Sequence, residues 1–408
     1  MQTRLADFVR DTPEGQEAAA ILGRCVHCGF CTATCPTYQL LGDELDGPRG
    51  RVYLIKQVLE GVAPTAKTQL HLDRCLTCRA CETTCPSGVQ YGRLLDIGRK
   101  LVDDKVPRSN GARLVRAAVK RGVTGPLFPV AMALGQAMRP LLPRLLRDQV
   151  PLRQQSGVWP RRRHPRKVLM LAGCVQPAMS PNINAATARV LDALGLETLV
   201  PDAAGCCGAI RFHLDDQAGG LADARRNIDA WWPQIEAGAE AIVMNASGCG
   251  SMVKEYGHLL RHDPDYAAKA ARISELTRDL SEFLPGFLSV LQERRVAAAG
   301  ERVVFHPPCS LQHGQRIRGA VEAMLAALGA EVLPVAESHL CCGSAGTYSL
   351  MQPDLSRQLR GRKLDALMAA KPEVILSANI GCIAHLGAAA GVPVRHWVEW
   401  LDEGLSTS

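Results

Sequence analysis

The sequence contains no hydrophobic run long enough to cross a membrane. Spanning a bilayer takes roughly 18 to 20 consecutive apolar residues, and the nearest candidate, residues 126–138, is only 13 residues long. The first residues, Met1-Gln-Thr-Arg-Leu-Ala-Asp, lack the apolar region of a secretory signal. We therefore expect a cytoplasmic protein without membrane-spanning helices.

The sequence also lacks the glycine-rich motifs that bind nucleotides. It has no G-x-G-x-x-G at the start of a βαβ unit and no G-x-x-x-x-G-K-[ST], so no dinucleotide or phosphate site is indicated. Aromatic residues make up only 4% of the chain and do not interleave with the basic residues, which argues against nucleic-acid binding. We expect no flavin site in this chain and assign it no catalytic residue.

Cysteine, in contrast, is abundant, with 16 residues. Eight of them form two runs with the spacing C-x2-C-x2-C-x3-C-P: Cys25, Cys28, Cys31 and Cys35, then Cys75, Cys78, Cys81 and Cys85. This spacing is typical of proteins that hold two 4Fe-4S clusters, and iron favours soft thiolate ligands. Electron transfer is therefore the first hypothesis for this chain.

The position of each cysteine relative to the prolines predicts how the two clusters are held. In two-cluster ferredoxins the cysteine before the proline ligates the other cluster. One cluster is therefore assigned to Cys25, Cys28, Cys31 and Cys85. The second is assigned to Cys75, Cys78, Cys81 and Cys35. Such crossed ligation would hold the two runs against each other.

Zinc and disulfides are the alternatives for these eight cysteines. Structural zinc sites use two short ligand pairs separated by a longer loop, which two runs of four cysteines fit badly. Disulfide frameworks belong mostly to small secreted chains, whereas this chain has 408 residues and no signal region. Sixteen cysteines without such a signal indicate a reducing compartment and metal ligation.

A chain of 408 residues is long enough for two or three domains. Between the two runs, residues 48–61 place apolar side chains at Val52, Ile55, Val58 and Leu59 and then reach a glycine. This pattern predicts an amphipathic helix. We therefore expect residues 1–105 to form a helical version of a two-cluster ferredoxin domain.

A basic segment follows this domain. Residues 139–167 contain nine Lys or Arg against one acid, Asp148, and five prolines, which predicts an irregular linker. We place this linker at residues 106–164. Its charge serves solvation alone, or it contacts anionic lipid at a cytoplasmic membrane face or an acidic partner subunit; the sequence does not decide between these three roles.

The remainder of the chain is an internal repeat. Residues 167–174, ending in Cys174, match residues 302–309, ending in Cys309, and a Cys-Cys-Gly triplet follows each at the same separation of 32 residues. A later apolar run in each half ends at Cys249 or Cys382. Apolar runs alternating with helical segments predict βαβ units with parallel strands. Ligands of such sheets sit outside the carboxyl ends of the strands, where these four cysteines fall.

Each half of the repeat has enough cysteines for a further cluster. The candidates are Cys174, Cys206, Cys207 and Cys249 in the first half and Cys309, Cys341, Cys342 and Cys382 in the second. A reversible thiol pair, or buried cysteines acting as small hydrophobes, would also account for them. Five histidines near cysteines are candidates for ligands or proton carriers, although a structural role is commoner: His27, His306, His313, His339 and His385.

Residues 25–51, residues 73–88 and the Cys-Cys-Gly repeat together resemble the iron-sulfur subunits of glycolate oxidases. The resemblance implies an α + α/β fold, in which the helical two-cluster domain precedes a duplicated α/β cysteine-rich domain with repeats at residues 165–300 and 301–408. It also implies FAD-containing partner subunits that oxidise glycolate to glyoxylate, and related 2-hydroxy acids such as D-lactate. Electrons would pass to a membrane quinone or other acceptor, with the chain inactive alone and peripheral on the inner face of the cell membrane.

One departure separates this chain from the heterodisulfide reductase subunits that share the repeat. Those subunits end each repeat in C-x-x-C, whereas Ala246 and Asn379 stand here where the first cysteine of that pair would be. A disulfide-cleaving thiol redox enzyme is thereby put in doubt, while an ordinary cluster is not. Two further hypotheses are the iron-sulfur subunit of anaerobic glycerol-3-phosphate dehydrogenase and a redox sensor that signals through cluster loss.

Overall fold

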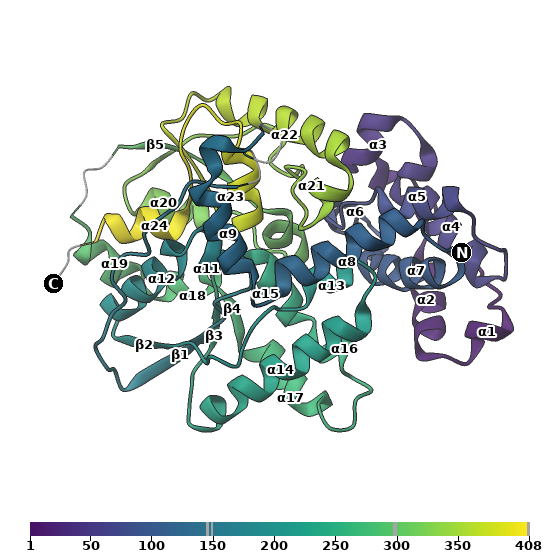
Figure 1. Cartoon of the computed structure of the whole chain (residues 1–408), viewed down its shortest axis with the longest axis horizontal. Helices are drawn as coiled ribbons and strands as arrows, with labels where there is room; N and C mark the ends of the chain where they lie inside the picture. Colours follow the sequence, from purple (N-terminus) through teal and green to yellow (C-terminus); the bar gives the residue numbers. More distant parts are fainter. Residues whose placement is uncertain (144–146, 148–149, 297–299, 406–408) are drawn as a thin grey trace.

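The chain folds into a helical amino-terminal part and two α/β units. The computed structural model of the chain describes residues 1–143, 147, 150–296 and 300–405. In Figure 1 the helical part, in purple, lies at one end of the molecule, and the two α/β units fill the rest. This arrangement confirms the predicted α + α/β fold class.

The amino-terminal part is built from short helices. They are α1 (Asp7–Arg10), α2 (Pro13–Arg24), η1 (Phe30–Thr32), α3 (Pro36–Leu41), η2 (Glu44–Asp46), α4 (Pro48–Leu59), α5 (Ala66–Asp73), α6 (Ala80–Thr84) and α7 (Tyr91–Lys105). Proline occupies the first turn of α2, α3 and α4, where its missing N–H removes no hydrogen bond. The helix predicted between the two cysteine runs is confirmed as α4.

One apolar core holds these helices around the cysteine runs. Helix α4 packs against α7, and Gly98 of α7 lies so close that a Cβ there would meet Ile55 Cγ1 at 2.5 Å. Leu22 and Leu94 are fully buried in the same core, which also includes Cys75. The packing therefore fixes the backbone on which the cysteines stand.

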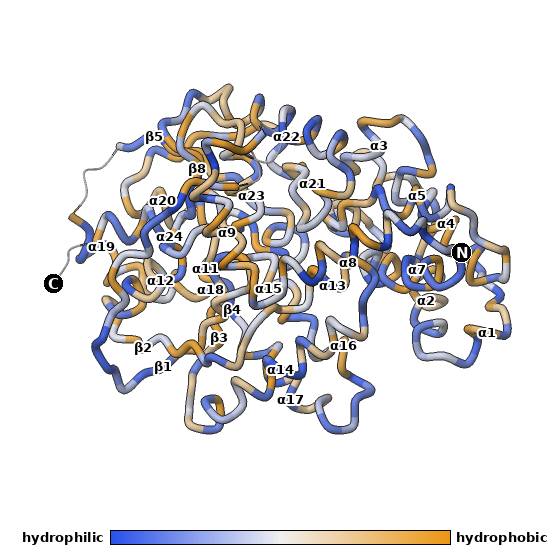
Figure 2. The backbone as a smooth tube through the Cα atoms, viewed as in Figure 1, coloured by the Kyte–Doolittle hydropathy of each residue, from blue (hydrophilic) through white to orange (hydrophobic). Residues whose placement is uncertain are grey.

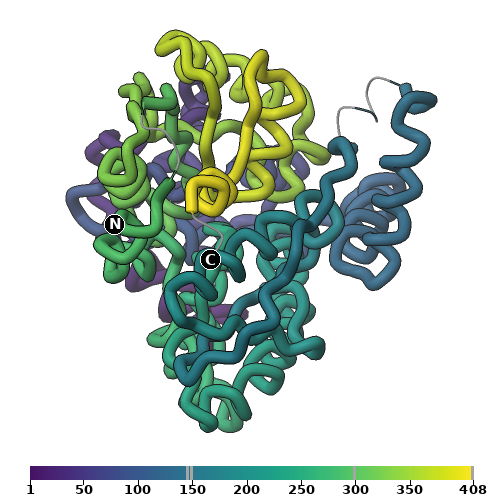
Figure 3. Tube along the Cα trace, turned by 90° about the vertical axis from the view of Figure 1, so that its left-hand side faces the viewer, coloured from purple at the N-terminus to yellow at the C-terminus, as the bar shows by residue number. Residues whose placement is uncertain are grey.

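Among its described residues, the segment expected to be an irregular linker includes two long helices and a short 3-10 turn. These are α8 (Asn110–Thr124), α9 (Phe128–Ala137) and η3 (Arg139–Leu141), while residues 151–164 have no regular element. Two basic side chains, Arg108 and Arg116, bind the carboxylate of Asp215 in the first α/β unit, Arg108 at 3.1 Å. Figure 3 shows these helices at one edge of the molecule. Arg144 and Asp148, part of the predicted charge run, lie outside the described residues.

The two α/β units contain parallel sheets of the same topology. The first has the order β2-β1-β3-β4 and the second β6-β5-β7-β8. Their strands are β1 (Arg166–Met170), β2 (Leu196–Leu199), β3 (Ile242–Met244), β4 (Thr277–Asp279), β5 (Arg302–His306), β6 (Glu331–Val332), β7 (Val374–Ser377) and β8 (Val394–His396). Figure 2 shows hydrophobic colouring along β1 and β3, as expected for strands covered on both faces. The predicted duplication with parallel strands is confirmed.

Helices cover both sheets. The first unit has α11 (Gln176–Met179), α12 (Asn182–Ala193), α13 (Ala209–His213), α14 (Gln217–Glu236), α15 (Ser247–Lys254), α16 (Tyr256–Leu259), α17 (Ala267–Leu276), α18 (Leu280–Phe283), η4 (Leu284–Phe287) and α19 (Leu288–Arg294). The second has η5 (Ser310–Gly314), α20 (Ala320–Ala327), α21 (Tyr348–Met351), α22 (Pro353–Met368), α23 (Ile380–Gly387) and α24 (Trp397–Glu403).

Helices of the two units pack against each other across the boundary between the units. Helix α24 of the second unit packs against α12 of the first, and α18 of the first packs against α20 of the second. Arg189 Nη2 and Asp402 Oδ2 lie 2.6 Å apart across the first of these contacts. Val168 and Trp397, from different units, share one apolar core. The repeats are thus separate in sequence but form a single packed body.

Candidate iron-sulfur centres

The first cysteine run surrounds a cavity at the surface of the helical domain. Cys25 directly follows α2, Cys28 lies in the loop beyond it, and Cys31 lies in η1. Cys85, from the second run, lines the same cavity as these three. Burial, together with the neighbouring thiols of Cys25, Cys28 and Cys85, raises the pKa of Cys31 to about 11. Four sulfur atoms from two distant segments therefore face one space.

The other four ferredoxin-type cysteines form a more buried set. Burial raises the pKa of Cys78, as do the nearby thiols of Cys309, Cys75 and Cys35. Burial likewise raises the pKa of Cys81, which lies near Cys78, Cys75 and Cys35. Cys85 is thus grouped with the first run and Cys35 with the second, which supports the crossed assignment.

Buried hydrogen-bond donors surround this second set. Arg99 Nη2 donates to the carbonyl of Cys75 at 2.7 Å, and the fully buried Arg51 donates from Nε to the carbonyl of His71 at 2.7 Å. The Tyr91 hydroxyl donates to Cys75 Sγ at 3.6 Å. Positive charge and hydrogen bonds beside the sulfurs favour the ionised thiolates that bind iron and tune the potential of a bound cluster.

The four cysteines of the first repeat meet beyond the carboxyl ends of β1 and β3. Cys206 contacts Cys174 and Cys207, and Cys207 contacts Cys249. Hydrogen bonds from the Cys174 and Cys207 thiols outweigh the effect of burial and lower the pKa of Cys206 to about 3. The backbone N–H of Gly208 also donates to Cys206 Sγ, at 3.4 Å. The negative charge is thus concentrated on Cys206, while the same contacts raise the pKa of Cys174 and Cys207.

The second repeat reproduces this arrangement. Cys309 Sγ lies 3.7 Å from Cys341 Sγ, and Cys342 bridges from Cys341 to Cys382. Gly343 N donates to Cys341 Sγ at 3.4 Å. All four candidate thiols of each repeat are thus brought together by the fold.

The backbone of each Cys-Cys-Gly triplet requires glycine at the third position. Gly208 has φ 92° and Gly343 φ 89°, a left-handed backbone that favours glycine. A Cβ would also lie 2.8 Å from the Gly220 carbonyl oxygen in the first repeat and 2.6 Å from the Ser356 carbonyl oxygen in the second. Only glycine lets the chain turn here with both cysteines facing inward.

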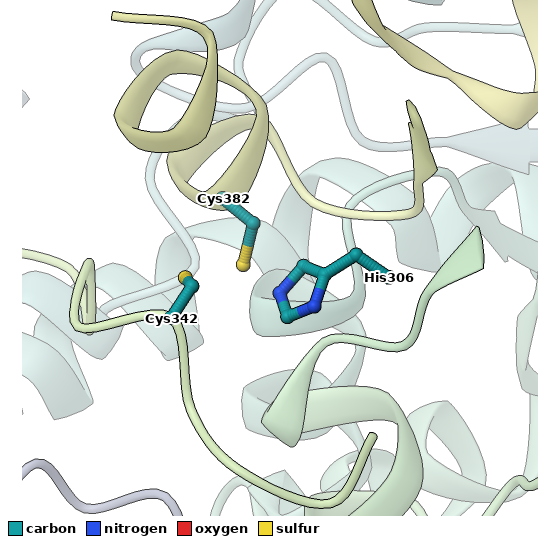
Figure 4. A group of neighbouring side chains, drawn as sticks. All are labelled: His306, Cys342 and Cys382. Atoms are coloured by element: carbon teal, nitrogen blue, oxygen red, sulfur yellow. The ribbon is translucent and has the colours of Figure 1, made fainter. Parts of the chain in front are cut away.

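Several histidines noted in the sequence have structural partners. His313 Nδ1 lies 2.8 Å from Thr83 Oγ1 and its Nε2 lies 2.8 Å from the carbonyl of His339. His385 Nε2 lies 3.2 Å from Ser356 Oγ, and His27 lines the first cavity. His306 differs, because its ring lies beside Cys342 and Cys382 (Figure 4).

One charged residue near the second repeat was not predicted. Lys363 is buried, and its Nζ donates to the carbonyl of Glu337 at 2.8 Å. Burial lowers the pKa of Lys363, whereas the thiols of Cys342 and Cys341 oppose that shift. A lysine within a helical stretch carries no motif, so nothing in the sequence pattern marks it.

The buried ferredoxin-type set adjoins the second repeat. Cys78 and Cys309 pack against one small apolar cluster that includes Leu76, Cys341 and Tyr348. The Tyr348 hydroxyl also donates to the carbonyl of Arg74 at 3.1 Å. Cys81 of the buried set lines the cavity of the first set as well. Three sets of thiols therefore form a row of neighbours: the set at the surface cavity, the buried ferredoxin-type set and the set of the second repeat.

The matches to protein families agree with this arrangement. Residues 21–89 match the 4Fe-4S dicluster domain, and residues 168–254 and 303–387 each match the cysteine-rich domain. The chain is 55% identical over 407 residues to the glycolate oxidase iron-sulfur subunit of Escherichia coli (strain K12), with 99% of each chain covered. The chain belongs to the glycolate oxidase iron-sulfur subunit family.

More distant relatives extend this family relationship. A probable glycolate oxidase iron-sulfur subunit of Bacillus subtilis (strain 168) is 29% identical, with 89% of this chain and 87% of that protein covered. Lactate utilization protein A of Geobacillus thermodenitrificans (strain NG80-2) is 30% identical over 58% of this chain and 98% of its own length. Thiolate sets of four in a dicluster domain fit 4Fe-4S clusters, so this family member is an iron-sulfur protein.

No helix within the described residues is both long and apolar enough to cross a membrane. This agrees with the absence of a long hydrophobic run in the sequence.

Proposed function

We propose that this chain is the electron-transfer subunit of a complex whose flavin subunits oxidise glycolate to glyoxylate. The observation that carries the proposal is the row of thiol sets, in which Cys81 faces the exposed set and Cys78 packs beside Cys309. Family membership supplies the substrate, because two of the relatives are named for glycolate oxidase.

The part played by the chain is to hold and connect clusters. Each cluster, when bound, accepts and releases one electron at a time. Cys25, Cys28, Cys31 and Cys85 hold the outer one, and Cys35, Cys75, Cys78 and Cys81 hold the inner one. The four thiols of each cysteine-rich repeat are the candidate ligands of a further cluster.

The outer thiol set faces the electron donor. Cys28 is exposed, and the apolar side chains beside it, Val26 and Phe30, are 68% and 60% exposed. Exposed apolar side chains around a redox site favour the docking of a partner protein. The flavin subunit docks here, and the second repeat, at the other end of the row, faces the acceptor.

Ligand replacement tests the crossed assignment. Cys85→Ser is expected to remove the same EPR signal as Cys28→Ser, while Cys35→Ser removes the other one. If Cys85→Ser instead removes the signal that depends on Cys78, ligation is not crossed. Iron content serves as the control that only one cluster is lost in each variant.

Turnover measurements test the division of labour between subunits. The chain alone is expected to reduce no artificial dye with glycolate, whereas the complex with its flavin subunits does, because the sequence carries no motif that indicates a flavin site. Substantial glycolate oxidation by the flavin-free chain would refute the proposal. Comparing kcat/KM for glycolate and D-lactate in the complex tests the substrate, since relatives named for lactate utilization cover just over half of this chain.

We also propose that the segment around α8 and α9 lies on an anionic membrane surface. Residues 106–164 contain twelve Lys or Arg and one Asp. Leu127 just before α9, Leu134 in α9 and Leu141 in η3 are 75%, 60% and 81% exposed. Basic residues around exposed apolar ones are typical of segments that bind at a lipid interface.

Vesicle sedimentation tests this placement. The chain is expected to bind vesicles of phosphatidylcholine with phosphatidylglycerol, to bind pure phosphatidylcholine weakly, and to dissociate as salt is added. Leu134→Asp should weaken binding, whereas Val62→Asp, at an exposed position of the ferredoxin domain, should not. If both variants still bind the vesicles, the membrane contact is contradicted. Binding of the segment to the flavin subunits instead would also contradict it.

A further inference from the structure

His306 is buried beside the thiols of the second repeat, where a site made of thiols alone would not require a histidine. It is the last residue of β5, three residues before Cys309, and only 1% of its surface is exposed. One ring nitrogen and the sulfurs of Cys342 and Cys382 all lie within 4.8 Å of one another. Figure 4 shows the ring pointing toward the space between these two sulfurs.

Neither ring nitrogen of His306 has a hydrogen-bond partner among the described residues. Leaving a buried polar group without a partner costs about 1–3 kcal/mol. The ring of His306 is buried, has two unpaired nitrogens and lies beside two thiols. These features indicate that it binds a group which the protein holds.

The spacing of these atoms fits a shared metal. Cysteine and histidine bind metals at about 2.3 Å and 2.1 Å, so two such donors on one ion, or on adjacent irons of a cluster, lie a few ångströms apart. Cys342 in turn contacts Cys341, whose sulfur is in contact with that of Cys309. The second repeat thus offers four thiols and one imidazole.

The first repeat has no such imidazole. Three residues before Cys174, at the position that matches His306, stands Leu171, which is buried in the apolar core of that unit. Asn379, which stands at the vacant C-x-x-C position of the second repeat, donates to Cys382 Sγ at 3.8 Å and accepts from Gly248 N at 3.2 Å. Asn379 thus serves as a bridge between the repeats, and His306 is the additional donor.

We propose that His306 is a nitrogen ligand of the iron-sulfur cluster in the second repeat, beside Cys342 and Cys382, whereas the first repeat holds its cluster with thiols alone. This inference rests on the proposed cluster in the second repeat. Of the five donors that the second repeat offers, the neutral imidazole takes one ligand position in place of a thiolate, which lowers the negative charge of the ligand set and raises the potential, as histidine does in Rieske centres. The two repeats, alike in fold, thus differ in redox chemistry.

This difference suits the position of the second repeat. Its thiols adjoin Cys78 of the buried ferredoxin-type set, whereas Cys207 and Cys249 of the first repeat pack among Trp231 and Tyr256. A centre with the higher potential draws electrons from its neighbour in the row. His306 therefore determines which repeat receives them.

Pulsed EPR of the full-length chain tests the assignment. Protein reconstituted anaerobically with iron and sulfide, and reduced with dithionite, is expected to show the nitrogen coupling of an iron-bound imidazole, which changes on labelling histidine with 15N. His306→Leu copies the first repeat and should abolish the coupling. His306→Cys should abolish it, retain the cluster, and make the midpoint potential of that cluster more negative.

Two controls separate this inference from the proposed function. His385→Gln, at a histidine bonded to Ser356, should leave the coupling intact. If the wild-type chain contains iron and sulfide for only the two ferredoxin-type clusters, or binds zinc in the repeat, the proposed further cluster fails. If the further cluster is present but the coupling is absent, or persists in His306→Leu, only the role of His306 is overturned.

Discussion

Thr83 Oγ1 of the ferredoxin domain and His313 Nδ1 of the second repeat lie 2.8 Å apart. The Nε2 of His313 lies 2.8 Å from the carbonyl of His339, and since a carbonyl only accepts, Nε2 carries the hydrogen. Burial lowers the pKa of His313 to about 4, so the ring is neutral near pH 7 and Nδ1 accepts from Thr83, whose one hydroxyl hydrogen is shared with the carbonyl of Ala80 at 3.0 Å. This bond joins α6 to η5 where the buried ferredoxin-type thiols meet the second repeat.

Thr83→Val should therefore destabilise the protein without removing a cluster. Valine keeps the shape of threonine but leaves His313 Nδ1 unpaired, which is expected to lower the free energy of unfolding by about 1–3 kcal/mol. Anaerobic urea unfolding and iron content measure the two effects. Thr198→Val is the control, because the buried Thr198 hydroxyl has no partner among the described residues; equal losses in both variants would show that the bond contributes nothing.

The contact between Arg189 and Asp402 should stabilise the packing of α24 against α12 of the first unit. Arg189 donates through Nε and Nη2 to one carboxylate, whose side chain is only 14% exposed, so Arg189→Ala is expected to cost about 1.5–3 kcal/mol. Arg272→Ala, which removes a pair with Glu275 that is 53% and 67% exposed, should cost under about 1 kcal/mol. Thermal unfolding of the two variants compares them, and a smaller loss for Arg189→Ala would contradict the packing described here.

Gly343→Ala should disrupt the second repeat. The added Cβ would meet the Ser356 carbonyl oxygen at 2.6 Å on a left-handed backbone, a strain of about 1–3 kcal/mol. We expect lower stability and loss of iron from this repeat alone. Gly361→Ala, at an exposed helical site with nothing within 4 Å of the new Cβ, should instead stabilise by about 0.5–1 kcal/mol. Normal iron content in Gly343→Ala would show that the turn tolerates a side chain.

His396 should make the protein less stable in acid. It is fully buried, and burial lowers its pKa from 6.5 to about 3. Between these values the unfolded chain binds a proton that the folded chain does not, so stability falls as pH drops below about 6.5, by up to about 1.4 kcal/mol per pH unit. Denaturant unfolding from pH 7.5 to 5.5 measures this slope.

His396→Asn should reduce that slope. The Nδ1 of His396 accepts from Val398 N at 3.1 Å at the start of α24, and asparagine caps a helix in the same way without titrating in this range. An unchanged slope in the variant would assign the acid sensitivity to other groups.

The sequence predicted those features that local patterns carry. Helix α4 followed from Val52, Ile55, Val58 and Leu59, and the strands before Cys174 and Cys309 followed from apolar runs that repeat along the chain. Helices α8 and α9 were missed, because prolines and basic residues nearby dominated the composition of the segment.

Features that depend on tertiary contacts could not be predicted. Nothing in the pattern indicates that α24 packs on α12 of the first unit as well as on its own sheet. The sequence placed His306 near a cysteine, but only the fold brings it to Cys342 and Cys382, which are 36 and 76 residues away. Lys363 becomes significant for the same reason, since burial beside thiols is a property of the folded chain.

Freeze-quench EPR of the complete complex tests most directly whether this chain carries electrons from the flavin subunits. On mixing with glycolate, the signals of the ferredoxin-type clusters and then that of the second repeat are expected to appear, while the isolated chain mixed with glycolate stays oxidised. In a Cys78→Ser complex the signal of the second repeat should fail to appear within a turnover. Reduction of the second repeat at the wild-type rate in that variant, or reduction of the isolated chain by glycolate, would contradict the proposed row of centres.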